Sequence, residues 1–348
     1  MKRAIRVGAV VLVFAVTFVA VLIRLPYYAI QPGPAREVEP LISVEGHERF
    51  PSAGRLIMTT VSWYQVTALQ ALIAWADPAQ SVVPDEDIYP PGETKSTEHQ
   101  RAISQMDTSK IVATSVALQA LTGYPKEHGT GALIEATTEG CPAYQRLFAG
   151  DLVREIDGTK IRSSMQADRA IEQVPVDEPV SFTVQAAGET HEIRLTRKRC
   201  VADVTRPLIG IALVEPFPFD VEIASGDIGG PSAGLMFALG LYDALTPGDL
   251  TDGRTIAGTG EIFPNGGVGP IGGIRDKVIA AQRVGASVFL VPADNMPELE
   301  GVDTGDMRLI SVRSFDQALR ELEALGGTLD ASPSPPTPTV PASTASPS

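Results

Sequence analysis

The chain opens with an apolar run that limits where the rest of it can fold. No charged residue occurs from Val7 to Ile23, and Leu25 extends the run to a predicted transmembrane helix over residues 7–25. At about 1.5 Å per residue, such a helix nearly crosses a hydrocarbon core of roughly 30 Å. Everything after it would then fold on one side of a membrane.

The charges before this run predict its orientation. Lys2, Arg3 and Arg6 precede it, and positive residues stay in the cytoplasm. We therefore expect residues 1–6 to be cytoplasmic and the bulk of the chain to be extracytoplasmic, held at the cell membrane by a single pass. The alternative is a cleaved signal peptide, but the run is long for one and no small-x-small cleavage site closes it.

Composition excludes one class of partner and predicts a tail. The formal net charge of −14 over 348 residues opposes binding to phosphates, so we expect no nucleic acid partner. An apolar content of 44% is typical of globular domains, of which the length allows two or three. Residues 330–348, rich in Ser, Thr, Pro and Ala, bury too little apolar surface to offset their ordering entropy and are predicted to be disordered.

The chain has two cysteines, Cys141 and Cys200. In an oxidising compartment an isolated pair is more often bridged than catalytic, so we predict a disulfide. The loop that it would close is long enough to contribute on the order of 4 kcal/mol in the loop-entropy model. The alternative is two unpaired buried thiols.

Residues 126–199 are predicted to alternate strands and turns around one helix, at about Ser164 to Gln173. Gly150-Asp151 leads into an apolar strand, and Asp157-Gly158 is a strong hairpin signal. This order resembles a bacterial PDZ domain.

The PDZ resemblance implies a β-rich unit that captures an extended peptide or a C-terminus as an added strand. The peptide-binding residues would be Gly131, Ala132, Leu133 and Ile134. The alternative is that the unit only packs against its neighbours.

Residues 201–325 alternate predicted strands and helices, which indicates an α/β (α+β) domain. Residues 40–125 contain a β-rich run and a long periodic helix, with a predicted loop over residues 77–95 between them. We expect residues 40–125 to complete the core of the later domain, with the PDZ-like region as an insertion. A separate accessory domain is the alternative.

Ser232 lies between glycines at the start of an apolar helix, in the sequence GPSAG. This sequence satisfies the G-x-S-x-G motif of α/β-hydrolases, but that family needs a later histidine and none follows Ser232. Residues 267–272 have the G-x-G-x-x-G spacing of a dinucleotide site, with Asp294 as the ribose ligand. Too little chain follows to complete such a domain. We expect no cofactor and no metal.

A third interpretation joins Ser232 to Lys277. The motifs PSAG, TGE and GGIRDK occur in this order, and together they closely resemble the proteolytic domain of Lon-type proteases. The resemblance implies a serine endopeptidase in which Ser232 is the nucleophile and Lys277 its base. Thr259 would support them by hydrogen bonding to the lysine amine. Two glycines, Gly229 and Gly230, stand where the ATP-dependent members often have an acid and one glycine.

The chemistry of this pairing requires a neutral lysine. Burial can lower a lysine pKa from about 10.4 to near 7.5, where the amine can accept a serine proton. Apolar residues that would surround Lys277 are Val268, Pro270, Ile271, Ile274 and Val278. Pro231 at a first helical position would leave backbone amides free for an oxyanion hole. Taken singly, Ser232 could be a helix N-cap and Lys277 a solvated helix residue.

An anchor, a PDZ-like unit and a Lon-type domain in one chain are similar to the YlbL-like family of membrane-anchored proteases. Such a protein would cleave protein or peptide substrates, from the membrane or exported, and a homo-oligomer is compatible with this interpretation. No G-x-x-x-x-G-K-[ST] motif occurs, so the activity would not depend on ATP. The non-enzymatic alternative is a membrane-tethered PDZ adaptor with a degenerate protease fold.

Overall fold

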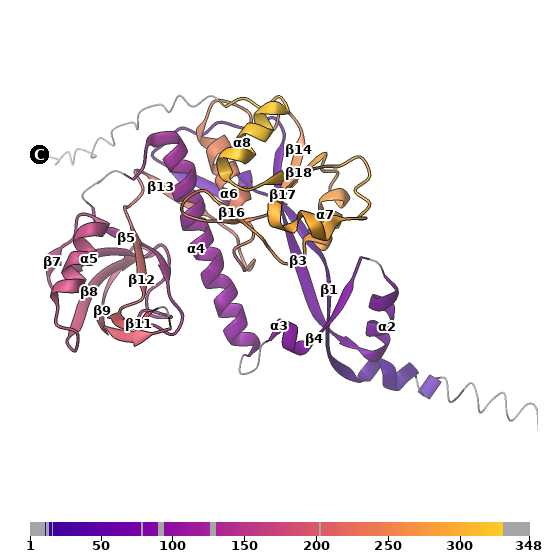
Figure 1. Cartoon of the computed structure of the whole chain (residues 1–348), viewed down its shortest axis with the longest axis horizontal. Helices are drawn as coiled ribbons and strands as arrows, with labels where there is room; N and C mark the ends of the chain where they lie inside the picture. Colours follow the sequence, from indigo (N-terminus) through magenta and orange to yellow (C-terminus); the bar gives the residue numbers. More distant parts are fainter. Residues whose placement is uncertain are drawn as a thin grey trace, which may run out of the picture.

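The computed structural model describes residues 11–329, apart from residues 12, 13, 16, 78, 90–93, 126–129 and 202. Figure 1 shows a mixed α/β core, a β-rich unit beside helix α4, and an arm of strands leading toward the N-terminal helical residues. No helix within the described residues is both long and apolar enough to cross a membrane. The predicted anchor, residues 7–25, lies partly outside these residues, and the predicted tail, residues 330–348, wholly outside them.

A mixed sheet forms the centre of the core, in the order β18–β17–β14–β3–β1–β4. The first four strands run parallel, whereas β1 is antiparallel to β3 and β4 is antiparallel to β1. In sheet order, the bounds are Arg308–Val312, Val288–Pro292, Thr255–Gly258, Arg55–Thr67, Arg24–Glu37 and Ser81–Pro84.

Helices cover both faces of this sheet because its strands are apolar on both sides. Met58 and Leu290 pack in the cluster formed with α4, α6 and α8, whereas Ile57 and Phe289 pack with α7 on the other face. The helices are α4 (Lys95–Thr122), α6 (Gly234–Leu245), α7 (Ile274–Arg283) and α8 (Phe315–Ala324). Every residue of α6 is buried, since α4 and α8 cover it.

The β-rich unit has its own sheet, in the order β12–β5–β6–β8–β9, with β7 beside β6. The bounds of these strands are Ile211–Val214, Ala132–Thr137, Leu152–Ile156, Pro179–Ala186, Glu189–Thr196 and Thr159–Lys160. A separate hydrophobic cluster fills this unit, and α5 (Ser164–Gln173) packs against it. The helix has the bounds that the sequence predicts.

The unit extends beyond its predicted end at residue 199. β12 is its edge strand and pairs antiparallel with β5, so the unit reaches Val214. The apolar run 206–224, which the sequence predicts as one strand-like stretch, is divided between β11 (Asp203–Leu208), β12 and β13 (Asp220–Ile223). β11 pairs with β10 (Lys198–Cys200) instead of joining the sheet.

The chain returns to the core at β13, which pairs with β2 (Ile42–Glu45). Since β3 lies in the middle of the core sheet and α4 packs on α6, residues 40–125 are part of the core and not a separate domain. The β-rich unit is inserted between α4 and β13. The predicted loop 77–95 contains β4 and the short helix α3 (Asp85–Ile88), because β4 pairs with β1.

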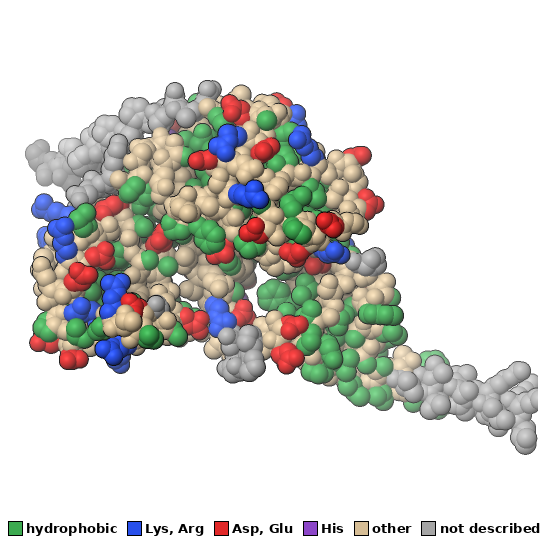
Figure 2. Space-filling model, in the orientation of Figure 1, with side chains coloured by type: hydrophobic (Ala, Val, Ile, Leu, Met, Phe, Trp, Pro, Cys, Tyr) green, Lys and Arg blue, Asp and Glu red, His purple; other side chains and the backbone are tan. Residues whose placement is uncertain are grey.

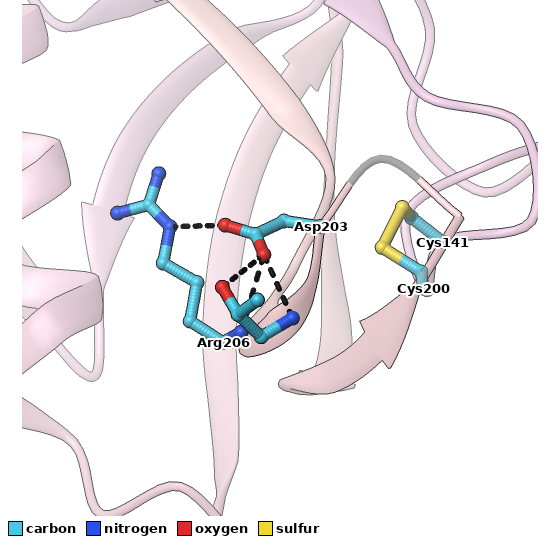
Figure 3. Close-up of a disulfide and its surroundings, with 5 residues drawn as sticks. Cys141, Cys200, Asp203 and Arg206 are labelled. Carbon is cyan, nitrogen blue, oxygen red and sulfur yellow. Dashed lines mark hydrogen bonds and ion pairs between the residues drawn. A yellow bond between two sulfur atoms is a disulfide. The ribbon is translucent and has the colours of Figure 1, made fainter.

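Cys141 and Cys200 are joined by a disulfide (Figure 3). The bond ties the turn that follows β5 to the end of β10. Close by, the Asp203 carboxylate accepts a hydrogen bond from Arg206 Nε at 3.1 Å. The disulfide therefore attaches the β10–β11 hairpin to the inserted unit.

Replacing both cysteines (Cys141→Ser with Cys200→Ser) should lower the free energy of unfolding of the inserted unit by about 4 kcal/mol, because the unfolded chain regains the freedom of a long loop. The two positions are 59 residues apart. Hydrogen exchange should show faster exchange for the amides of β5 and β8. The amides of β14 and β17 in the core are the internal control, and unchanged protection in β5 would contradict the prediction.

Candidate active site

Ser232, Thr259 and Lys277 come from three elements on different sides of the core sheet. Ser232 precedes α6 on one face, Lys277 lies in the first turn of α7 on the other face, and Thr259 follows directly after β14. The three side chains meet beyond the carboxyl end of β14, between the starts of the two helices.

The hydrogen bonds join these residues into one cluster. Lys277 Nζ donates to Ser232 Oγ at 2.7 Å and to Thr259 Oγ1 at 3.0 Å. Thr259 Oγ1 donates to the backbone oxygen of Ser232 at 2.9 Å, and Gly260 N donates to the same oxygen at 2.8 Å. Thr259 therefore holds both the lysine amine and the backbone that carries Ser232.

Burial changes the protonation of Lys277. The residue is 2% exposed, and burial lowers the pKa of its amine to about 7. Both hydrogen-bond partners of Nζ are hydroxyls, which offer no negative charge to favour the ammonium form. Near neutral pH a substantial fraction of Lys277 is thus the free amine, which can accept the proton of a serine hydroxyl.

The apolar surroundings of Lys277 differ in part from the predicted set. Ile274 and Val278 are buried on α7, and Ile271 packs against their cluster. Val268 packs against the main core instead, and Pro270 is exposed. Strands β1, β3, β14 and β17 supply further apolar contacts of α7, which the spacing around Lys277 does not reveal.

The start of α6 corrects another expectation. The helix begins at Gly234 with Ala233 as its N-cap, so Pro231 is not at a first helical position. Pro231 O accepts hydrogen bonds from Gly234 N at 3.2 Å and from Ser109 Oγ at 3.0 Å, which holds residues 231–234 in a turn. The turn arises from contact with α4, and proline alone does not determine it.

Ser232 does not serve as a helix cap. Its hydroxyl bonds to Lys277, and the N-cap residue Ala233 makes no side-chain capping bond. Among the hydrogen bonds of the described residues, none uses the backbone N–H of Ser232 or of Ala233. Two amide donors beside the serine hydroxyl are therefore free.

Two successive glycines let α4 support the loop that carries Ser232. A Cβ on Gly229 would lie 2.6 Å from Ala102 Cβ, so only glycine allows this contact. Gly230 has a φ of +87°, and its N–H donates to Ala102 O at 2.7 Å. No hydrogen bond of the described residues joins Asp227 to Ser232 or Lys277, although Asp227 lines the same cleft.

The cluster lies in a cleft of about 780 Å³. The consecutive residues 59–63 of β3 form one wall, and α4 contributes His99 and Ala102. From the predicted loop 77–95, the side chains that border the cleft are Ile88, Tyr89 and Lys95. Sequence reasoning missed the β3 and α4 walls. The β-rich sequence of this segment predicts a strand, but it does not identify the neighbouring strand or the cleft that the strand borders.

The predicted peptide-binding residues lie on a strand with no free edge. Gly131 leads into β5, whose residues Ala132, Leu133 and Ile134 are buried. β5 pairs with β12 on one side and with β6 on the other. A peptide therefore cannot add to β5, because β12 already occupies that position. In the sheet of the inserted unit, as far as the structure describes it, the edge strands are β12 and β9.

Among the described residues, no group of three or more His, Cys, Asp or Glu side chains could hold a metal ion. The cleft offers a serine hydroxyl, a buried amine and free backbone amides.

Residues 220–324 match the family model described as the Lon protease (S16) C-terminal proteolytic domain. The match begins at the first residue of β13 and ends at the last residue of α8. This part of the chain is therefore similar to a Lon-type proteolytic domain, and the match supports a serine peptidase.

Curated relatives agree with this assignment. The chain is similar to the Lon protease of Heliobacterium modesticaldum, with 40% identity over 95 residues that cover 26% of this chain and 11% of the relative. It is similar to Lon protease 2 of Bacillus subtilis, with 33% identity over 116 residues that cover 31% of this chain and 20% of the relative. The chain thus spans a fifth or less of the length of these relatives.

Solved PDZ domains cover about a quarter of the chain. The PDZ domain of the SdrC-like protein from Listeria innocua is 26% identical and covers 25% of this chain and 97% of its own, with a TM-score of 0.22. The PDZ domain of the SdrC-like protein from Listeria monocytogenes is 26% identical and covers 26% of this chain and 94% of its own, with a TM-score of 0.23.

Thr259→Val should lower kcat for a short peptide on the order of tenfold, since it removes a hydroxyl whose hydrogen bonds each contribute about 1 kcal/mol. It should also move the midpoint of the pH–rate profile to lower pH, because the amine becomes still less solvated. Thr259→Ser keeps the hydroxyl and is the matched control, with a rate and midpoint near those of the unaltered protein. An unchanged rate and midpoint in the valine variant would show that Thr259 only packs.

Proposed function

We propose that the protein is a membrane-anchored, ATP-independent serine endopeptidase of the YlbL-like kind, which cleaves exported or membrane proteins outside the cytoplasm. Ser232 is the nucleophile and Lys277 the general base. The observation that carries this proposal is the buried Lys277 amine, with a pKa of about 7, placed 2.7 Å from Ser232 Oγ.

The proposed reaction begins when the neutral Lys277 amine accepts the Ser232 proton and Oγ attacks the carbonyl carbon of the peptide. The free N–H groups of Ser232 and Ala233 are the candidate donors to the oxyanion that forms. The Lys277 ammonium then returns its proton to the departing amine. Water repeats these steps to release the acyl group from Ser232.

Thr259 acts as a positioning residue in this scheme. A neutral amine has two N–H groups and one lone pair, and the lone pair must point at Ser232 Oγ. Because Thr259 Oγ1 donates its own hydrogen to Ser232 O, it can only accept from Lys277 Nζ. One N–H is thereby held on Thr259, which favours the orientation in which the lone pair faces the serine hydroxyl.

Ser232→Ala and Lys277→Arg should each abolish peptide hydrolysis and labelling by a serine-reactive fluorophosphonate, because a guanidinium cannot be deprotonated at usable pH. The double variant should be no worse than either single one, since the two residues act as a unit. Lys277→Met, which is neutral and similar in length, guards against misfolding of the arginine variant, and thermal unfolding checks each protein.

The rate of the unaltered protein should rise with pH through a single ionisation near 7, because Lys277 is protonated and inactive below its folded pKa. An active, folded Lys277→Arg variant would overturn the mechanism. Failure of Ser232 to react with the probe would favour the adaptor alternative instead.

The proposed topology is supported by Lys2, Arg3 and Arg6 before the apolar run and by a disulfide in the later chain. Protease added to intact cells stripped of their wall should digest everything beyond about residue 28. A cytoplasmic marker protein must remain intact in the same sample. Full protection of the chain would refute the orientation.

We further propose that the inserted unit recruits substrates by adding a peptide strand at β12. Its support is that β12 is an edge strand and packs beside α5. Both elements carry partly buried apolar side chains, Ile211 and Leu213 on β12 and Ala170 on α5, with Val174 directly after the helix. An edge strand beside an apolar helix is the arrangement that strand addition requires.

Ala170→Trp should fill this groove and reduce the turnover of casein while leaving hydrolysis of a short peptide unchanged. Glu172→Trp adds the same bulk at an exposed position of α5 and is the matched control. It should leave both activities unchanged. Equal loss of both activities in Ala170→Trp would indicate that the unit is structural.

A further inference from the structure

One helix of the arm carries its bulky apolar residues on the outside. The arm consists of β1, β3, β4 and α2 (Ala68–Ala76), and it leads away from the core (Figure 1). The sequence of α2, ALQALIAWA, has no charged residue. The outer surface of this helix therefore carries no charge.

The packing of α2 is the reverse of what a soluble helix needs. Its inward residues are small, since Ala71 and Ala74 pack against a cluster on the arm. Its outward residues are Leu72, Ile73 and Trp75, which are 62%, 58% and 80% exposed. We call these three residues the α2 face. In Figure 2, hydrophobic side chains gather over this arm next to the N-terminal residues. A helix on a soluble surface normally buries its large apolar residues and exposes polar ones.

The α2 face lies beside the end of the N-terminal apolar run. Ala68 N, at the start of α2, donates to Ile23 O at 3.2 Å, and Arg24 pairs with Thr67. Thr67 caps the helix, and its hydroxyl accepts from Gln70 N. The start of α2 is therefore fixed to the residue at which the apolar run ends.

We propose that the α2 face is a second membrane contact, which lies in the interfacial layer of the outer leaflet beside the anchor. This proposal rests on the proposed membrane anchoring. If the run ending at Ile23 spans the bilayer, its hydrogen bond to Ala68 holds α2 at the level where the run leaves the hydrocarbon. Tryptophan favours this level, and an uncharged helix has no charge to desolvate there.

A second contact determines the tilt of the arm. A single spanning helix leaves the rest of the protein free to lean, whereas two contacts on different elements hold one orientation. β3 runs from Thr67, beside the membrane, to Val61 in the wall of the cleft. Six residues of extended strand span about 20 Å. This part of the cleft would thus stand at most about 20 Å above the bilayer, where it meets segments close to the membrane.

The two tryptophans of the chain, Trp63 and Trp75, allow a direct test. Trp63→Phe in the full chain leaves Trp75 as the reporter, and Trp75→Phe leaves Trp63 as the matched control on β3. Each protein is reconstituted into phosphatidylcholine vesicles with or without brominated acyl chains. We expect brominated lipid to reduce Trp75 emission about twofold or more, because an indole at the interface contacts the upper acyl chains. Trp63 emission should change little, and circular dichroism checks folding.

Flotation of the same vesicles after carbonate extraction reports the anchor separately. Protein that does not float would overturn both the anchoring and the α2 contact. Protein that floats while Trp75 stays exposed to water would overturn the α2 contact alone. Blue-shifted Trp75 emission without bromine quenching would assign the α2 face to a protein partner, such as a second copy, and would equally overturn the proposal.

Discussion

The parallel pairing of β3 with β14 holds the core together across the inserted unit. Arg55 pairs with Thr255 at a sequence separation of 200 residues, and the register continues to Met58 and Gly258. β3 is thereby one of the strands on which both α6 and α7 pack. The family match over residues 220–324 contains neither β3 nor α4, so the peptidase domain depends on an earlier part of the chain for its walls.

This dependence extends to the protonation of Lys277. α7 is covered by β1 and β3 as well as by the strands of the matched domain, and that cover is what excludes water from the amine. The pKa of Lys277 in the folded state lies below the unfolded value of 10.5. Below about pH 7 the folded state is therefore destabilised by the full cost of burying the charged amine. The cost falls as pH rises from there toward the unfolded pKa. The free amine is present near neutral pH because the fold tolerates this penalty.

The sequence predicts those parts of the site that short motifs encode. Ser232, Thr259 and Lys277 each lie in a contiguous motif, and the structure brings the three together. The helix Ser164–Gln173 is predicted with its correct bounds, and the structure adds a capping bond from Gln166 N to the preceding serine hydroxyl.

The failures concern contacts between distant segments. Pro231 was expected to open α6, but Ser109 and Ala102 on α4 hold that turn. On β5, where the sequence predicts the peptide site, β12 from far along the chain pairs with Leu133 and Ile134. Neither contact can be predicted from the local sequence. Strand order and helix docking depend on packing between distant segments, which the residue spacing within one segment does not reveal.

The insertion also affects the order in which the Ser232–Lys277 cluster can assemble during synthesis. The ribosome releases β3 and α4 long before their partners β14 and α6, so the early part of the core has nothing to pair with at first. The inserted unit has its own cluster and can fold in the interval. Only after α7 and β17 have emerged can the amine lose its water and become a base. In a nascent chain, Ser232 therefore has no buried amine beside its hydroxyl until α7 has emerged and packed.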